Sequence, residues 1–190
     1  MADFFQNSAI TTLHKLRERP IEDIEQELTE FSRQRPMALI LPSLYSELEG
    51  EALPAIVERY PNVVYIILGA THPHVIQHEG ESYRLSLQWM AQEQGVEGHV
   101  IFYNRFVERH ELIAFIAAAD IYVTPYLEEA QITSGTLAYA MGTGKAVIST
   151  PYWYASEMLA EDRGRMVPFR NPEAMAEQII ALLDNDVERH

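Results

Sequence analysis

Cysteine is absent from this chain of 190 residues, which excludes a disulfide scaffold and a thiolate zinc site. Lysine occurs only twice, as Lys15 and Lys145. Aspartate and glutamate (28 residues) outnumber lysine and arginine (14), so the formal net charge is −14. A general basic surface for nucleic acid is therefore not expected. An anionic ligand would need a local device, such as a helix N-terminus or a few convergent arginines.

Long apolar runs are also missing. The longest, such as residues 63–68 (VVYIIL), have the length of a strand, so we expect no membrane span. The first 20 residues lack a basic start followed by an apolar core and a small-residue cleavage site, and we expect a cytoplasmic protein. Apolar residues make up 47% of the chain and charged residues 22%, which is typical of a globular domain with a real core.

Short β-rich runs alternate with amphipathic segments from residue 37 onward. The expected strands are residues 37–41, 63–68, 99–103, 120–125, 146–150 and 165–169. They are nearly continuous apolar runs, as in parallel strands covered on both faces. Between them, residues such as Leu53, Ile56 and Tyr60 share one helical face. The pattern predicts an α/β fold over residues 37–190, with a doubly wound, mostly parallel, six-stranded Rossmann-like sheet.

Residues 1–36 carry two helical patterns and no strand pattern. In the second, Ile21, Ile24, Leu28 and Phe31 form one apolar stripe. We expect an N-terminal helical arm that docks on apolar surface, and a homodimer formed through this arm stays open.

A candidate anion site follows the fourth expected strand. Residues 133–136 (TSGT) open an alanine-rich helix on the side of the sheet where ligands bind in such folds. The free N–H groups and the dipole of a helix start attract anions, and Gly135 allows a close approach. Ordinary capping explains a serine or threonine at a helix start equally well. Both interpretations remain open.

A histidine-rich loop follows the second expected strand. His72, His74 and His78, with Glu79, could grip a zinc ion. No other residues have metal-ligand spacing, so we expect no metal ion. The favoured interpretation is that a histidine such as His74 contacts a substrate phosphate or hydroxyl.

Charged residues in the expected ligand-side loops are further candidates. The arginines are Arg84, Arg105, Arg109, Arg163 and Arg165. They either hold a diphosphate or serve surface solubility. Glu128 and Glu129 either contact a sugar hydroxyl or form a solvated acidic turn. No Ser-His-Asp order, P-loop or GxGxxG is present, because the GTGK at residues 142–145 follows a helix rather than opening one.

Residues 51 to about 186 resemble the C-terminal half of family 4 (group 1) glycosyltransferases of the GT-B fold. The resemblance is carried by AADIYVTPY, by GTGKAVIST and by the closing GRMVPF. It implies a half that binds a nucleotide diphosphate sugar (a UDP-, GDP- or ADP-sugar) for retaining glycosyl transfer, with no cofactor. It also implies that backbone from Asn104 through Arg105 to Val107 meets the base. The amides of Ser134, Gly135 and Thr136 would meet the diphosphate. Independently of the resemblance, we take Arg84 and His74 as further substrate contacts because of their place in the expected ligand-side loops.

The chain departs from that family at several positions. The family carries two glutamates, separated by seven residues, across this loop and helix. Here Gln131 and Tyr139 stand at those positions, and Glu129 lies two residues too early to substitute directly. We take Gln131 and Glu129 as the candidate catalytic residues and Tyr139 as a substrate contact. The family's upstream diphosphate-gripping lysine also has no counterpart, since no lysine or arginine occurs between Arg35 and Arg59.

Residues 1 to about 53 instead resemble the N-terminus of glucosyl-3-phosphoglycerate synthases, which have the GT-A fold. That resemblance places residues 41–50 (LPSLYSELEG) at a nucleotide site, with Glu47 as a contact. The Asp-x-Asp metal motif of those enzymes is absent, which argues against a complete GT-A enzyme. The chain thus looks like a chimera joined near residues 50–54. We expect a nucleotide-sugar-binding half whose transfer activity is impaired without an acceptor domain; the alternative is a non-catalytic scaffold domain with a vestigial site.

Overall fold

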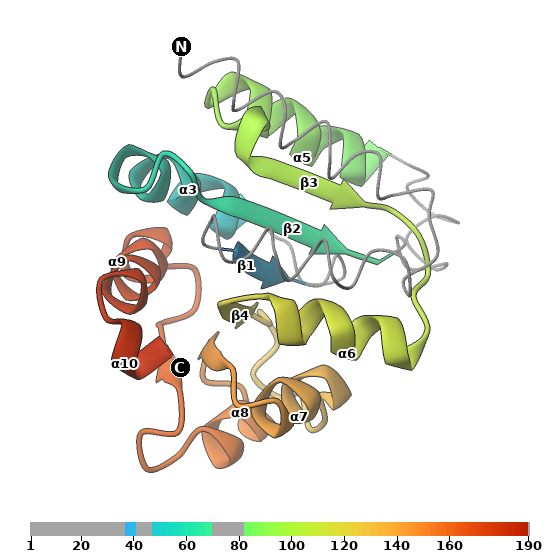
Figure 1. The fold of residues 1–190 in the computed structure, drawn as a ribbon, viewed down its shortest axis with the longest axis vertical. Helices are drawn as coiled ribbons and strands as arrows, with labels where there is room; N and C mark the ends of the chain where they lie inside the picture. The colour runs from blue at the N-terminus through green and yellow to red at the C-terminus, as the bar shows by residue number, and fades with distance from the viewer. Residues whose placement is uncertain (1–36, 41–46, 70–81, 190) are drawn as a thin grey trace.

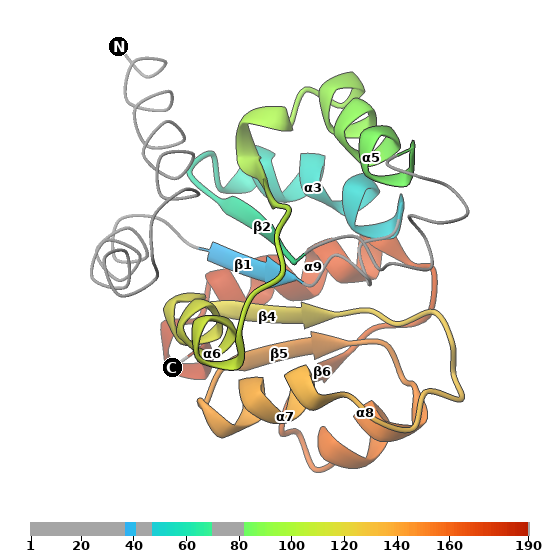
Figure 2. The ribbon, with the colours of Figure 1, turned by 90° about the vertical axis from the view of Figure 1, so that its right-hand side faces the viewer.

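One parallel sheet organises the protein. The computed structural model describes residues 37–40, 47–69 and 82–189. The strands are β1 (Met37–Ile40), β2 (Val64–Leu68), β3 (Val100–Tyr103), β4 (Ile121–Thr124), β5 (Ala146–Ser149) and β6 (Arg165–Met166). Their order is β3-β2-β1-β4-β5-β6, and every neighbouring pair is parallel (Figures 1 and 2). The strand order reverses between β1 and β4, which is the crevice where ligands bind in open α/β sheets.

Helices cover both faces of this sheet. They are α3 (Glu47–Arg59), α5 (Ser82–Glu93), the short 3₁₀ helix η1 (Glu97–His99), α6 (Arg109–Ala118), α7 (Gly135–Gly142), α8 (Trp153–Met158), α9 (Pro172–Leu183) and α10 (Asp186–Arg189). Side chains from α3, α5 and α9 build the core on one face, and those from α6, α7 and α8 build it on the other (Figures 1 and 2). The predicted α/β, Rossmann-like fold is confirmed, and all strand pairs in the described residues are parallel.

Strand β2 shows why the apolar runs are continuous. Val64, Ile66 and Leu68 join one core cluster, whereas Tyr65 and Ile67 join the cluster on the opposite face. All five side chains are buried. Because successive side chains point to opposite faces, a strand covered by helices on both sides needs apolar residues at every position.

The strand ends differ slightly from the sequence prediction. His99 belongs to η1 rather than to β3. The last strand covers two residues instead of the predicted 165–169. Its ladder continues for one further bond, from the Val167 N–H to the Ser149 carbonyl. Phe169, whose N–H is the next one on the side of β5, lies in a turn, which ends the pairing.

Helix α9 begins with an asparagine cap that a proline follows. The Asn171 side chain accepts a hydrogen bond from the Ala174 N–H at 2.9 Å, and Pro172 occupies the first turn. Helix α9 then packs against α3. None of the helices in the described ranges combines the length and apolar character needed to cross a bilayer.

Several sequence predictions fall outside the described residues. They are the helical arm of residues 1–36, a homodimer through that arm, most of the loop at 41–50, and the histidine loop that contains His74. The domain division at residue 36 likewise stays a prediction.

Candidate functional site

The first turn of α7 lies at the carboxyl edge of the sheet, directly after β4. Ser134 has an extended backbone and caps the helix, and its Oγ accepts a hydrogen bond from the Leu137 N–H at 3.3 Å. The helix begins at Gly135, within the predicted stretch of residues 133–136. The capping interpretation of TSGT therefore holds.

Capping leaves two backbone donors of this turn available. The Ala138 N–H bonds the Ser134 carbonyl at 3.2 Å, whereas the N–H groups of Gly135 and Thr136 have no acceptor within the described ranges. Gly135 is exposed, and a Cβ added there would meet no atom within 4 Å. The turn is thus open to solvent, and its free N–H groups and helix dipole favour an anion.

A buried tyrosine anchors this turn to the sheet. The Tyr122 hydroxyl, on β4, donates to Thr136 Oγ1 at 2.7 Å, and Ser134 Oγ lies 3.3 Å from the same oxygen. Burial raises the pKa of Tyr122, so its hydroxyl stays protonated at neutral pH. Sequence reasoning missed this residue. The one available signal was a tyrosine in an otherwise aliphatic and threonine-containing strand.

The loop between β4 and α7 is braced against the start of α8. The Trp153 N–H donates to the Glu129 carbonyl at 2.9 Å, and the Tyr154 N–H to the Gln131 carbonyl at 3.3 Å. Gln131 Nε2 donates to the Thr133 carbonyl at 2.7 Å, so this carboxamide is turned toward its own loop. The Glu129 side chain is exposed. The two candidate catalytic residues therefore share one loop with the α7 start.

Tyr139 plays a packing role. Its ring is partly buried against the core cluster beneath α6, α7 and α8. The ring thus contributes to the core at the position where the resemblance predicts a substrate contact.

The Arg105 side chain is already paired with neighbouring residues. Its guanidinium donates to Glu111 Oε1 at 2.5 Å and to the Tyr103 hydroxyl at 3.0 Å. Glu111 Oε2 also accepts from the Glu108 N–H at 2.8 Å, at the start of α6. Burial alone would raise the pKa of Glu111, but the Glu108 N–H and the Arg105 guanidinium outweigh it and hold the pKa below its ordinary value. This geometry fastens α6 and leaves Arg105 a weaker candidate for a diphosphate.

The loop after β3 exposes an aromatic ring that sequence reasoning missed. Asn104 is half-buried and Val107 packs partly against the core, whereas Phe106 between them is 75% exposed. Ile132 and Trp153, after β4 and β5, are also exposed. Because these strands are parallel, all three side chains follow carboxyl ends of strands, at the same edge of the sheet as the α7 start.

Arg84, Arg163 and Arg165 lie away from this turn. Arg84 lines a cavity of about 300 Å³ whose walls come from α5, η1 and β3, three strands away from β4. Arg165 begins β6 and Arg163 precedes it, so both lie at the amino edge of the sheet. The prediction that Arg163 and Arg165 belong to ligand-side loops is wrong. The described residues also contain no cluster of three metal-ligating side chains.

Comparison with known proteins gives the family. The sequence model described as "Glycosyl transferases group 1" matches residues 47–185. The chain belongs to this family. The match includes α7 and the loop that precedes it.

Two relatives match different stretches of this family member. It is 29% identical over 136 residues to a phosphatidyl-myo-inositol mannosyltransferase of Mycolicibacterium smegmatis, covering 71% of this chain and 31% of that protein. It is 52% identical over 66 residues to a glucosyl-3-phosphoglycerate synthase of Persephonella marina, covering 35% of this chain and 16% of that protein. The chain thus spans less than a third of either relative. Both predicted resemblances are confirmed.

Solved structures share the fold. The C-terminal domain of a group 1 glycosyl transferase (LpcC) from Francisella tularensis superposes with a TM-score of 0.69 at 18% identity, covering 87% of this chain and 85% of that one. Anabaena Alr3699/HepE in complex with UDP superposes with a TM-score of 0.71 at 17% identity, covering 92% of this chain and 46% of that one. At identities of 18% and 17%, this structural similarity shows the fold of the chain and nothing more.

Proposed function

We propose that this chain is the nucleotide-sugar-binding half of a group 1 glycosyltransferase, with the first turn of α7 as its diphosphate site. The observation that carries the proposal is the pair of free N–H groups at Gly135 and Thr136, at a capped and sheet-anchored helix start. The fold neighbour Alr3699/HepE was solved in complex with UDP, which supports a nucleotide diphosphate as the ligand class.

The base and the sugar of the nucleotide sugar would lie on either side of this turn. The exposed Phe106 ring and the backbone from Asn104 to Val107 offer a surface for the base. The braced loop with Glu129 and Gln131 faces the sugar end of the ligand. The helix start, rather than cationic side chains, supplies most of the compensation for the diphosphate charge, because Arg105 is already paired with Glu111. Binding is accordingly weak.

Transfer by this chain alone is slow or absent. The departing diphosphate would be stabilised mainly by two backbone donors. Gln131 is neutral and bonded to its own loop, and Tyr139 is packed against the core. The chain also spans only 31% of the mannosyltransferase of Mycolicibacterium smegmatis, so the activity of that whole protein does not carry over to this chain.

Calorimetric titration with UDP, GDP and ADP tests the proposal. We expect saturable binding of at least one nucleotide to the wild type and its loss in Gly135→Val, whose side chain covers the two donors. Gly142→Val is the matched control, because Gly142 closes the same helix and is equally exposed, with nothing within 4 Å of an added Cβ. Absence of heat with all three nucleotides, or equal affinity in both variants, would refute it.

A second candidate is a non-catalytic chimeric domain with a vestigial site. It is favoured by the inward-turned Gln131 carboxamide and by the packed Tyr139 ring. The same titration separates the two candidates, since a vestigial site gives no nucleotide-dependent heat and no thermal shift.

A further inference from the structure

A separate cavity of about 610 Å³ lies at the amino ends of β5 and β6, across the sheet from the α7 start. Its walls come from the turns that precede these strands and from α9 and α10, and they include Lys145, Asp162, Arg163, Arg165, Leu182 and Glu188. The volume is within the usual range for small-molecule sites, about 300 to 1,000 Å³. None of the residues proposed to bind the nucleotide sugar lines this cavity.

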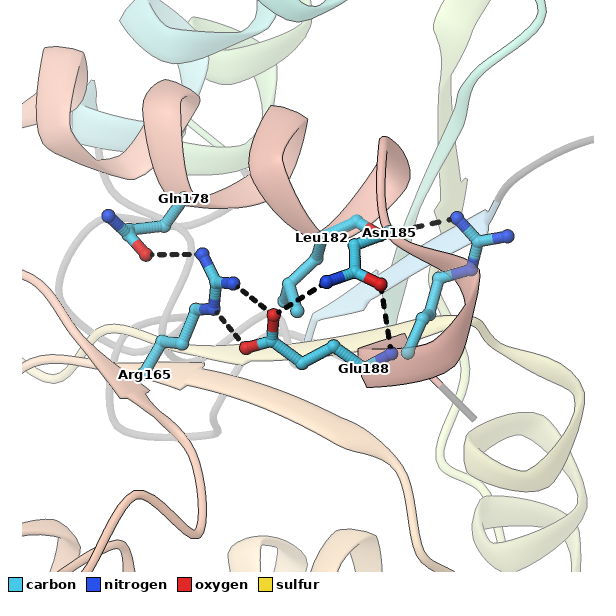
Figure 3. Close-up of polar contacts among 6 residues, drawn as sticks. Arg165, Gln178, Leu182, Asn185 and Glu188 are labelled. Carbon is cyan, nitrogen blue, oxygen red and sulfur yellow. Dashed lines mark hydrogen bonds and ion pairs between the residues drawn. The ribbon is translucent and has the colours of Figure 1, made fainter.

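Positive charge is concentrated in these walls. Three of the nine lysine and arginine residues in the described ranges line the cavity, although the chain as a whole is strongly acidic. One of the three is neutralised. Arg165 binds both carboxylate oxygens of Glu188, at 2.9 and 2.6 Å, and donates to Gln178 Oε1 at 2.8 Å (Figure 3). This pairing ties β6 to α9 and α10 and forms a fixed wall.

Lys145 has no such partner. Its ammonium is half-buried and makes no hydrogen bond or ion pair with any residue in the described ranges. Burial lowers the pKa of Lys145, and the negative charge of Asp120 opposes this shift. Asp120 is itself 3.6 Å from the Arg189 guanidinium. A half-buried cation without a direct counter-charge is unfavourable, and a bound anion would relieve it.

Arg163 supplies a second cation in the same walls. Its Nε and one terminal nitrogen donate to the carbonyls of Ala160, at 2.8 Å, and Glu157, at 3.3 Å. These bonds orient the side chain but leave its charge without a carboxylate among the described residues. A guanidinium has five N–H donors, so the majority remain available to oxygen atoms of a ligand.

We propose that this cavity binds a small organic phosphate monoester, with its phosphate held by Lys145 and Arg163. Lys145 and Arg163 have no ion-pair partner within the described ranges, and their two positive charges outweigh the single exposed Asp162 carboxylate in the same walls, which favours an anion. The volume exceeds that of an inorganic phosphate, which leaves room for the organic part. The exposed Asp162 carboxylate in the same walls can accept hydrogen bonds from hydroxyl groups of that part and disfavours more highly charged polyanions.

Pyridoxal phosphate followed by borohydride is a suitable probe, because it is a phosphate monoester that carries an aldehyde. With the phosphate of the probe at Arg163, the neutral form of the Lys145 amine adds to the aldehyde with loss of water, and hydride from borohydride reduces the resulting C=N bond to a stable secondary amine. The chain has only Lys15 and Lys145, so peptide mass mapping assigns the product unambiguously. We expect Lys145 to be labelled about tenfold more than Lys15, the effect of one charge-assisted contact.

Pyridoxal, which lacks the phosphate, is the control for amine reactivity. A lowered pKa makes Lys145 more reactive toward both aldehydes, so only a larger Lys145-to-Lys15 ratio with pyridoxal phosphate supports a phosphate site. Glycerol phosphate should compete with this labelling, whereas sodium chloride at the same ionic strength should not. Equal ratios for the two aldehydes, or no competition, would overturn the proposal.

Variants identify the second cation. Arg163→Gln should reduce labelling of Lys145 by pyridoxal phosphate to the level seen with pyridoxal. Arg109→Gln, an exposed position on α6, should leave it unchanged. Unchanged labelling in Arg163→Gln would contradict the assigned role of Arg163. If that variant fails to fold, the competition experiment on the wild type still decides the proposal, and neither test depends on nucleotide binding at α7.

Discussion

Two buried tyrosines offer a matched test of how the α7 start is held. Tyr122 and Tyr152 are both fully buried. The Tyr122 hydroxyl donates to Thr136 Oγ1 at 2.7 Å, whereas the Tyr152 hydroxyl has no partner within the described ranges. Replacing each by phenylalanine removes one oxygen atom and keeps the ring.

The two replacements should act in opposite directions. A typical intramolecular hydrogen bond contributes about 1 kcal/mol net, so Tyr122→Phe should lower the free energy of unfolding by roughly this amount. A buried hydroxyl without a partner is unfavourable by about 1 to 3 kcal/mol, so Tyr152→Phe should leave the free energy of unfolding unchanged or raise it. The Tyr152 ring keeps its edge-on contact with Tyr126 in either case.

Urea unfolding followed by circular dichroism at pH 7 measures both values. For a domain of this size, 1 kcal/mol corresponds to a shift in Tm of about 2 to 4 °C, so calorimetry provides a second readout. Equal destabilisation by the two replacements, or no effect of Tyr122→Phe, would refute the assigned anchoring of α7 to β4.

The remaining predictions concern the ends of two helices. Glu111→Gln should lower the free energy of unfolding at pH 7 by about 1 to 2 kcal/mol, because the carboxylate accepts from the Glu108 N–H and from Arg105. The folded-state pKa of Glu111 lies below its ordinary value of 4.5, so this stabilisation is complete above that pH and is lost as the pH falls through the folded-state pKa. Urea unfolding from pH 7 down to pH 3 checks both points, and a difference that stays constant with pH would contradict them. Asn171→Ala should lower the stability by about 1 kcal/mol through loss of the cap on Ala174, and Asn171→Asp should restore most of it; equal thermal stability of the alanine variant and the wild type would rule this out.

The fold could be predicted from the sequence because the patterns that indicate it involve residues close together in the chain. Strand β2 is apolar at every position, and Asn171 with Pro172 marks the start of α9. The helix start at Ser134 was accessible for the same reason, since a serine followed by a glycine favours a cap.

The contacts that build the site could not be predicted as well, because they join residues that are distant in sequence. The bond from Tyr122 to Thr136 spans 14 positions and depends on how α7 crosses β4. Arg163 and Arg165 were assigned to the wrong edge of the sheet. Strand β6, which Arg165 begins, has only two residues and α8 has only six, so the sequence pattern does not separate a loop after a strand from a loop before one. The half-buried position of Lys145, which has no ion-pair partner in the part of the chain that the structure describes, depends on tertiary packing, which no local pattern predicts.

The central claim is that the first turn of α7 receives the diphosphate of a nucleotide. Amide NMR of the ¹⁵N-labelled protein, recorded while UDP, GDP or ADP is added, tests this claim most directly. The account predicts that the largest saturable shifts of at least one titration fall on the Gly135 and Thr136 N–H groups, and that Gly142 at the other end of the helix is little affected. Saturable shifts concentrated away from this turn, or no shifts with any of the three nucleotides, would contradict it.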